Sequence, residues 1–347
     1  MRVVLAGGGT GGHLYPGIAI AEKLEREKVD ILFMVSNRDV DSKILSSMNY
    51  SFIVQDVTPV KGKGLLYKIN SFLKLLVQVV KNIKLIKRND KVLLLGGFAS
   101  AAAGLTALLK RCEIYVHEQN SVMGFANRFF VRFAKKVFLS FEIKNMEIPN
   151  AVLTGNPVRE GIAEIEPKYE HSRHLLVLGG SQGSRFINKL MIESFGRLKK
   201  EGIKIKHQTG AMLYNETVNG YKAKYGRYKG EDLEITDYVN DIQDVLKWSD
   251  AVVSRAGSGS VYEIMYAKRP AVFIPLKLAA DNHQYFNAKF FEEHGYGYVL
   301  TEDEAVPENF CEKIISLFEN YNEFSRKLAS IKRLNASELI LSEMGFV

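Results

Sequence analysis

The chain has 347 residues, 46% of them hydrophobic and 25% charged, which is typical of a soluble globular protein large enough for two domains. Its two cysteines, Cys112 and Cys311, lie too far apart in the sequence for a metal-binding motif, and so few cysteines suit a reducing compartment. No export signal precedes the first predicted strand, so we expect a protein that is not exported. The net charge is +8, and most of the excess lies in residues 1–155, which carry 22 lysines and arginines but only 12 aspartates and glutamates. A basic first half is compatible with binding to nucleic acid or to an anionic membrane.

Short aliphatic segments alternate with longer segments of helical periodicity along the whole chain. This alternation predicts parallel β-α-β units and therefore a doubly wound α/β fold. A stretch with turn signals and two prolines, residues 150–167, separates two sets of strands, so we expect two domains that face each other across a cleft. The predicted strands are residues 3–6, 30–35, 91–95, 114–117, 136–140, 174–179, 203–208, 233–238, 251–255 and 271–275.

The first predicted strand runs into a glycine turn at residues 7–12. Backbone N–H groups at such a turn point outward at the positive end of the helix dipole, and glycines let phosphate or sugar oxygens approach. The turn matches a dinucleotide pattern, but Ser36, Asn37 and Arg38 follow the second strand where an acidic residue should hold the ribose. NAD is therefore disfavoured, and no P-loop motif occurs, while a purely structural turn remains an alternative.

His13 follows this turn at the start of the first predicted helix. A histidine titrates near neutral pH and can take a proton from an attacking hydroxyl, although a structural histidine is the more common case. Asp39 and Asp41 follow the second predicted strand and form a D-x-D pattern. That pattern can hold a metal-bound nucleotide sugar, but the helical segment after it favours an N-cap.

Residues 64–88 combine apolar positions at helical spacing with six basic residues and no acidic one. The segment is too interrupted by charge to cross a bilayer. It suits an amphipathic helix on a membrane surface, or a helix that packs its apolar side on its own domain, and the second reading is favoured at most positions. The residues best suited to lipid contact lie at its start: Leu65, Leu66, Tyr67, Lys68, Ile69, Phe72 and Lys74.

Further turns repeat the pattern of the first. Gly96 and Gly97 follow one strand, and residues 175–190 repeat the sequence of buried strand, glycine turn and amphipathic helix. Residues 252–264 place Ser258, Ser260 and Glu263 after another strand, where they either bind a diphosphate and a ribose or only begin a helix. Amide-rich clusters at residues 117–120 and 281–287 also follow strands, and amides suit sugar hydroxyls.

Seven motifs in this order resemble the MurG family of peptidoglycan glycosyltransferases, in glycosyltransferase family 28. They are GGTGGHLYPG, LLLGGFASAAAG, HEQN, GNPVR, LGGSQGSR, SRAGSGSVYEI and DNHQYFNA, and they extend from Gly8 to Ala288. The resemblance implies a glycosyltransferase B fold of two Rossmann-like domains. Residues 1–156 would be the acceptor domain and 157–333 the UDP-GlcNAc domain, with a C-terminal helix at about 334–347 returning to the first.

The resemblance also implies the substrates: UDP-GlcNAc as donor and undecaprenyl-diphosphate-linked MurNAc-pentapeptide as acceptor, with no cofactor, no metal and no nucleic acid. It implies peripheral attachment to the cytoplasmic face of the cell membrane. Glu263 would hold the ribose, and Val239 the uracil through its backbone. Tyr238 and Ser258 stand where the family often has phenylalanine and alanine.

The implied donor contacts are Thr10, Gly11, Gly12, Asn120, Arg159, Ser181, Tyr238, Val239, Ser258, Gly259, Ser260, Val261, Tyr262, Glu263, His283 and Gln284. The implied acceptor and diphosphate contacts are Gly9, Gly96, Gly97, His117 and Glu118. The family's reaction inverts the anomeric centre, so one displacement needs a base, for which His13 is our first choice. The alternatives are a non-enzymatic binder of nucleotides or nucleic acid, and a related glycosyltransferase acting on another lipid such as a diacylglycerol.

Overall fold

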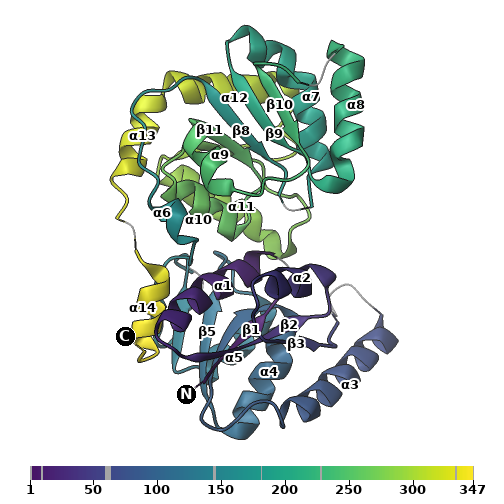
Figure 1. Ribbon diagram of the computed structural model, residues 1–347, viewed down its shortest axis with the longest axis vertical. Helices are drawn as coiled ribbons and strands as arrows, with labels where there is room; N and C mark the ends of the chain where they lie inside the picture. The colour runs from purple at the N-terminus through teal and green to yellow at the C-terminus, as the bar shows by residue number, and fades with distance from the viewer. Residues whose placement is uncertain are drawn as a thin grey trace. The chain divides into compact units, whose positions relative to one another are not determined.

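The computed structural model describes residues 2–8, 11–58, 64–143, 146–180, 182–226, 229–332 and 334–346. The chain divides into two compact units, Met1–Val158 with Leu334–Val347, and Arg159–Arg333 (Figure 1). The predicted boundary between residues 156 and 157 falls close to this division.

The first unit is built on a seven-stranded sheet in which every strand pair is parallel. The strand order is β3-β2-β1-β4-β5-β6-β7, so the direction of winding reverses between β1 and β4, as in doubly wound folds. The strands are β1 (Arg2–Gly7), β2 (Asp30–Ser36), β3 (Phe52–Gln55), β4 (Lys91–Gly96), β5 (Glu113–Glu118), β6 (Lys136–Leu139) and β7 (Ala151–Leu153).

Helices cover both faces of this sheet because neighbouring strand residues point to opposite faces. Val3 and Leu5 of β1 pack with α1 and α14, whereas Val4 and Ala6 pack with α4 and α5. The C-terminal helix α14 lies beside α1 (Figure 1), where Glu338 pairs with Lys23 at 3.3 Å. The helices are α1 (Gly11–Arg26), α2 (Asp39–Ser47), α3 (Leu65–Asn82), α4 (Gly97–Lys110), α5 (Phe125–Phe130), the short η1 (Val131–Phe133) and α14 (Ala336–Glu343).

The second unit repeats this topology in a six-stranded parallel sheet. The order β10-β9-β8-β11-β12-β13 reverses between β8 and β11, which therefore correspond to β1 and β4. The strands are β8 (His174–Leu178), β9 (Lys204–Gln208), β10 (Leu233–Thr236), β11 (Ala251–Ser254), β12 (Ala271–Phe273) and β13 (Gly297–Val299).

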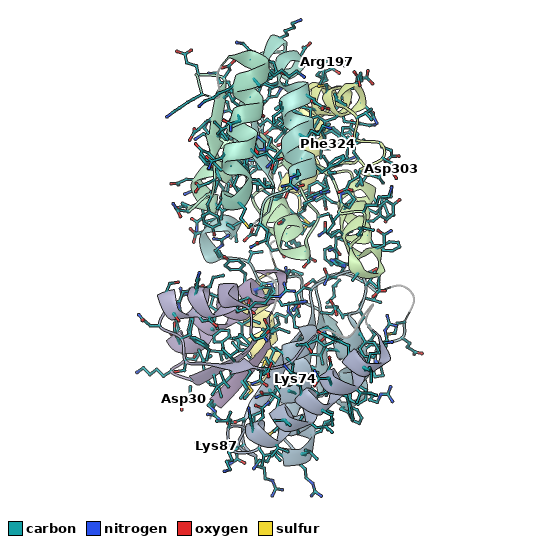
Figure 2. The ribbon with its side chains drawn as sticks, turned by 90° about the vertical axis from the view of Figure 1, so that its right-hand side faces the viewer. Asp30, Lys74, Lys87, Arg197, Asp303 and Phe324 are labelled. Atoms are coloured by element: carbon teal, nitrogen blue, oxygen red, sulfur yellow. The ribbon has the colours of Figure 1, made fainter. Side chains whose placement is uncertain are left out.

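One face of this second sheet is covered by α7, α8, α12 and α13, and Phe324 of α13, labelled in Figure 2, belongs to that core. On the other face, Phe273 of β12 packs edge-on against Phe291 of α11 with ring centres 5.0 Å apart. The helices are α6 (Glu160–Ala163), α7 (Arg185–Lys200), η2 (Ala211–Leu213), α8 (Tyr214–Tyr225), α9 (Ile242–Trp248), α10 (Ser258–Tyr266), η3 (Ala280–Asn282), α11 (His283–Glu293), α12 (Pro307–Glu319) and α13 (Tyr321–Ala329).

The predicted doubly wound α/β class is confirmed, and each of the ten predicted strands corresponds to a strand of one of the two sheets. The strands β3, β7 and β13 were not predicted, and each has only three or four residues. The predicted linker at residues 150–167 contains the edge strand β7 and the helix α6, so it is not a structureless connection. No helix among the described residues is long and apolar enough to span a bilayer.

Candidate functional site

Doubly wound sheets bind ligands at the carboxyl ends of the strands, where the strand order reverses. These switch points lie after β1 and β4 in the first unit and after β8 and β11 in the second. The sequence predicts glycine turns at all four strand ends. The two switch points nevertheless differ in what occupies them.

The protein's own atoms fill the first switch point. A Cβ atom on Gly97 would lie 2.8 Å from the Gly8 carbonyl oxygen, and one on Gly96 would lie 3.2 Å from Cε1 of His13. Both Gly96 and Gly97 also have positive φ angles, of 90° and 77°. Glycine is therefore required here because the two turns and the histidine ring approach one another closely.

His13 lies in the first turn of α1, where its ring is partly exposed. Its Nδ1 atom is 2.9 Å from Oε1 of Gln119, which is fully buried. The Gln119 amide nitrogen in turn lies 3.1 Å from the carbonyl oxygen of His117 and 3.1 Å from the ring nitrogen Nδ1 of the same residue. A partly exposed imidazole is thus held at one nitrogen by a buried amide.

Glu118 organises the loop that follows β5. Its carboxylate accepts hydrogen bonds from the backbone of Asn120 at 3.0 Å, from the backbone of Gly124 at 2.9 Å and from the side chain of Asn127 at 2.9 Å. Both His117 and Glu118 are buried, with polar atoms bonded to protein groups. Burial lowers the pKa of His117 to about 3, so this ring is neutral.

Asp41 borders the first glycine turn. It is buried, accepts a hydrogen bond from the Ser36 hydroxyl at 2.7 Å, and has Oδ2 2.6 Å from where a Cβ of Gly8 would lie. The helix α2 begins at Asp39 after Arg38, which makes no side-chain cap. The predicted N-cap role is therefore wrong for Asp41, which instead lies in the first turn and supports the Gly8 backbone.

At the second switch point, Gly179 and Gly183 are packed against backbone atoms, but three other glycines face open space. Gly180 follows β8 with a φ of 80°, and Gly257 and Gly259 follow β11; a Cβ atom added to any of the three would meet no atom of the described residues within 4 Å. The helix α10 begins at Ser258, so its first backbone N–H groups border this open space. Such an arrangement is suited to a diphosphate.

An ion pair lies at the same end of the second unit. Nη2 of Arg159 is 3.1 Å from Oε1 of Glu263, which lies in the second turn of α10. Burial raises the pKa of Glu263 above its usual 4.5, and the arginine opposes that rise without cancelling it. Two of the donor contacts that the family resemblance implies are thus in direct contact with each other.

The amide cluster of the second unit begins α11. Oε1 of Gln284 accepts a hydrogen bond from the Leu276 backbone at 3.0 Å, and the His283 ring donates to the Ala280 carbonyl at 2.7 Å. Asn287 is fully buried and donates to the Ala256 carbonyl at 3.2 Å. It therefore connects α11 to the turn that precedes α10.

The remaining predicted donor residues differ in exposure. Tyr238 is exposed after β10 and Val239 is half-buried, whereas Asn120 and Ser260 are partly exposed. The side chains of Val261 and Tyr262 are buried in the core, so only their backbone atoms could contact a ligand. The predictions for Gly9, Thr10 and Ser181 lie outside the described residues, and Gly11 and Gly12 begin α1.

The hydrophobic side of helix α3 faces outward, whereas an amphipathic helix usually buries that side. Its buried side carries Ser71, Gln78 and Asn82, and the Asn82 amide donates to Oε1 of Gln55 at 2.7 Å. The exposed hydrophobic side chains are Leu66, Tyr67, Ile69, Phe72, Leu73, Leu76, Val77 and Val80. The expectation that most apolar positions pack on their own domain is therefore wrong: polar side chains take much of the buried side, and Val79 with Leu75 are the apolar residues that pack there.

Two basic residues of the helix lie among these exposed side chains. Lys68 is exposed, and Lys74, labelled in Figure 2, forms an exposed ion pair with Asp56 at 3.2 Å. The side chain of Leu65 lies outside the described side chains. Outward hydrophobic residues beside lysines are typical of a surface that meets another apolar phase.

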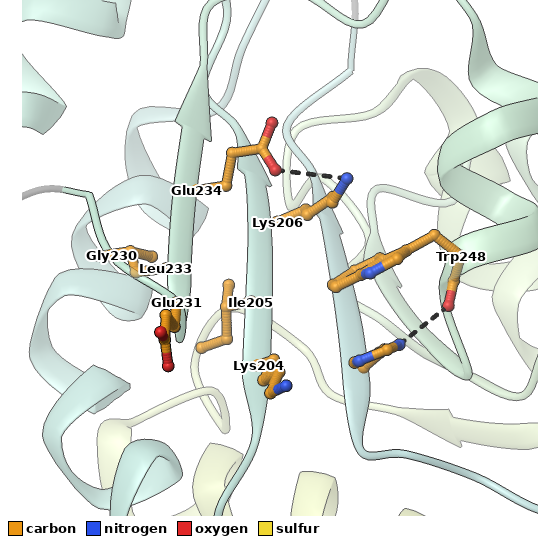
Figure 3. A pocket seen from close by; sticks show the side chains of 9 residues that line it. Lys204, Ile205, Lys206, Gly230, Glu231, Leu233, Glu234 and Trp248 are labelled. Atoms are coloured by element: carbon orange, nitrogen blue, oxygen red, sulfur yellow. Dashed lines mark hydrogen bonds and ion pairs between the residues drawn. The ribbon is translucent and has the colours of Figure 1, made fainter.

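A hollow of about 350 Å³ lies on the second sheet, but away from the switch point (Figure 3). His174, Lys204 and Leu233 each begin a strand, so the hollow is at the amino-terminal ends. Two pairs of its lining groups interact within the protein: Lys206 with Glu234 at 3.3 Å, and the His174 ring with the Trp248 carbonyl at 3.2 Å. It contains none of the predicted site residues. In the described part of the chain, no three metal-ligating side chains cluster together.

The sequence places Gln119 and Asn287 in amide clusters expected to suit sugar hydroxyls, and it gives Asn127 no role. All three are buried amides that hold a site loop. Gln119 and Asn287 lie within motifs that the sequence singles out, but the direction of an amide cannot be read from its motif.

Two family models match the chain. The glycosyltransferase family 28 N-terminal domain matches residues 3–139, and the glycosyltransferase family 28 C-terminal domain matches residues 174–340.

Relatives match along nearly the whole chain. A protein of Geobacter metallireducens is 34% identical over 361 residues, which are 99% of this chain and 98% of its own. One of Francisella philomiragia is 32% identical over 360 residues, with 98% and 96% covered. Both are named UDP-N-acetylglucosamine–N-acetylmuramyl-(pentapeptide) pyrophosphoryl-undecaprenol N-acetylglucosamine transferase.

Solved structures share the fold. MurG of Acinetobacter baumannii has a TM-score of 0.77 at 23% identity and covers 98% of each chain. The glycotransferase of kitacinnamycin has a TM-score of 0.69 at 13% identity, with 99% of this chain and 98% of its own covered. The fold is therefore the two-domain glycosyltransferase B fold.

Proposed function

Because the chain belongs to glycosyltransferase family 28, we propose that it transfers N-acetylglucosamine from UDP-GlcNAc to the 4-hydroxyl of undecaprenyl-diphosphate-linked MurNAc-pentapeptide. Relatives whose names print this transfer match 98–99% of the chain at 32–34% identity, and they support it. The product would be the lipid-linked disaccharide that builds peptidoglycan.

We assign the nucleotide to one unit rather than the other because their switch points differ. The open backbone at Gly180, Gly257 and Gly259 leaves space for a diphosphate, whereas Gly96 and Gly97 are packed against the protein itself. We therefore place the nucleotide on the second unit, with Glu263 on the ribose diol. This contrast is the observation that carries the assignment.

His13 is the proposed base. In an inverting displacement the acceptor oxygen bonds to C1 of the sugar as the bond from C1 to the diphosphate oxygen breaks, and the proton of the hydroxyl must leave. The partly exposed imidazole, held at Nδ1, has Nε2 left to receive that proton. His117 and Glu118, being buried, would support the loop rather than contact the acceptor.

The leaving UDP carries away negative charge that needs stabilisation. Backbone N–H groups at the start of α10, together with Arg159, are the proposed source. We expect no metal to be required by these groups, so transfer should continue in the presence of EDTA. Loss of turnover on chelation, restored by a divalent cation, would contradict this part.

The first unit is proposed to attach peripherally to the cytoplasmic face of the cell membrane. The outward apolar side of α3 and its lysines support this, because each basic residue near an anionic surface contributes roughly 1 kcal/mol. Nucleic acid is not an expected partner.

The test of the function is a transfer assay with purified protein. Lipid-linked muramyl pentapeptide is offered with UDP-GlcNAc, UDP-Glc or UDP-Gal in parallel. We expect a disaccharide product from UDP-GlcNAc and little from the other two. Equal transfer of the three sugars, or transfer to diacylglycerol instead, would reject the assignment.

A further inference from the structure

We infer that Gln119 is a positioning residue that holds His13 in the tautomer protonated at Nδ1, so that Nε2 is free to accept a proton. This inference rests on the proposed role of His13 as the base. It concerns a residue that touches neither substrate in the proposed site. The inference follows from the direction of one buried amide.

The carbonyl oxygen of His117 sets that direction. A backbone carbonyl can only accept a hydrogen bond, so the Gln119 group 3.1 Å from it must be the amide NH₂. Asn127 donates to the same carbonyl oxygen at 3.1 Å, so this oxygen accepts hydrogen bonds from two side-chain amides. The oxygen of the Gln119 amide must then face the other way, toward His13.

The ring of His117 agrees with this direction. Its Nδ1 atom lies 3.1 Å from the Gln119 nitrogen, so the second amide hydrogen has an acceptor if His117 is unprotonated there. His117 is fully buried, and burial lowers its pKa to about 3, so it stays neutral across the working range. Its other ring nitrogen, Nε2, lies 3.3 Å from the hydroxyl oxygen of Ser140 and so also has a hydrogen-bonding partner. The Gln119 amide thus forms all of these hydrogen bonds only when its NH₂ group faces His117 and its oxygen faces His13.

The consequence falls on His13. An amide oxygen has no hydrogen to give, so Nδ1 of His13, 2.9 Å away, must carry the proton. In the neutral ring, Nε2 then bears the lone pair. If Gln119 did not hold Nδ1, the ring could place its proton on Nε2 and would lose its capacity as a base at that atom.

The test combines spectroscopy with kinetics on the full-length protein. Long-range proton–nitrogen NMR of ¹⁵N-histidine-labelled protein reports the tautomer of each ring, and a His13→Ala sample identifies the His13 signals. We expect wild-type His13 to be protonated at Nδ1 when neutral. In Gln119→Met, which lacks an acceptor, we expect the Nε2–H form to appear and kcat to fall roughly 10–100-fold, with UDP affinity changed less than about twofold.

Two further variants separate positioning from folding. Gln119→Glu keeps an acceptor at the same place, so it should retain the Nδ1–H form and recover turnover relative to Gln119→Met. Gln55→Met removes another fully buried glutamine of the same sheet, at the end of β3, and should leave both the His13 tautomer and kcat unchanged. Methionine at either position is expected to lower stability similarly.

The outcomes distinguish this inference from the proposed function. A wild-type His13 protonated at Nε2, or a kcat in Gln119→Met within twofold of wild type, would overturn the positioning role. If instead the tautomer changes as expected but wild-type protein transfers no GlcNAc, the proposed function fails and the positioning role stands, because the NMR measurement needs no substrate.

Discussion

At the scale of single residues, each unit carries one ionisable group with a proposed role in the reaction. His13 is partly exposed and bonded at one nitrogen, as a proton acceptor must be. Glu263 is partly buried against Arg159, as suits a carboxylate that fixes a ribose. In each case a neighbouring side chain fixes the group through one atom, and the rest of the group can still contact a substrate.

Glu263 leads to a prediction about pH. Its pKa is raised above 4.5 by burial, so it takes up a proton at a higher pH than an ordinary glutamate. If its carboxylate accepts hydrogen bonds from the ribose, UDP affinity should fall as pH decreases through that raised pKa. Glu263→Gln should bind UDP about 10–100-fold more weakly at neutral pH, as expected for the loss of a charged hydrogen bond.

Isothermal titration of UDP from pH 8 to pH 5 checks this, with the variant as the reference for titration of UDP itself. The difference in affinity between wild type and Glu263→Gln should shrink toward acid pH. An affinity at neutral pH that the substitution leaves unchanged would exclude Glu263 from the ribose site.

The sequence names candidate site residues but not how their side chains are placed. The resemblance includes His13, Glu263 and the HEQN motif, but it does not reveal that His117 and Glu118 are buried or that Gln119 faces the His13 ring. Those facts depend on the directions of side chains from β5 and α1, which are distant in sequence. Local patterns carry no such information.

At the scale of elements, α3 is the helix whose orientation matters most. Periodicity predicted an apolar side correctly but not where that side points. It points outward because Gln78 and Asn82 of α3 bond each other at 3.0 Å, and Asn82 bonds Gln55 of β3 on the buried side. An amide network among distant residues has no signature in a hydropathy pattern. The strands β3, β7 and β13 were not predicted, although β12, which has only three residues, was.

The outward side of α3 can be tested on vesicles. Leu73 and Val77 are each 55% exposed, and each side chain contributes about 1.5–3 kcal/mol when fully buried in an apolar phase. The double substitution Leu73→Ser with Val77→Ser should lower partitioning onto anionic vesicles at least tenfold, as a sedimentation assay would measure. Rising salt should weaken the binding of both proteins.

Met212, which is 88% exposed on η2 of the second unit, offers a matched control. Met212→Ser should leave vesicle binding unchanged. If it weakened binding as much as the α3 substitutions, or if those had no effect, α3 would not be the membrane contact.

At the scale of the whole molecule, two sheets with the same strand order carry different chemistry. The sequence repeat at residues 175–190 predicted the shared topology, and the family resemblance predicted the B fold. What the repeat could not show is that one switch point is filled by His13 while the other has three glycines that face open space. That difference depends on ring and turn positions rather than on the number of glycines.

Each unit also holds one buried neutral histidine, which makes the fold sensitive to acid. Burial lowers the pKa of His117 and of His207 to about 3 from 6.5. Unfolded histidines bind protons below pH 6.5 and the folded ones do not, so stability falls as pH decreases from 6.5 toward 3. At pH 5 each should cost roughly 2 kcal/mol.

Urea unfolding at pH 7 and pH 5 measures this loss. His207→Gln should reduce the pH dependence of unfolding, whereas His294→Gln, at an exposed position, should not. An unchanged dependence in His207→Gln would show that His207 does not stay neutral in the folded protein.

The central claim, that His13 is the base of a GlcNAc transfer, is tested most directly by the turnover of His13→Ala at saturating UDP-GlcNAc and lipid-linked muramyl pentapeptide. A positioned base contributes ~10²–10⁴-fold, so kcat should fall by that factor while UDP affinity stays nearly unchanged. Turnover within a few-fold of wild type would contradict the claim and place the base elsewhere.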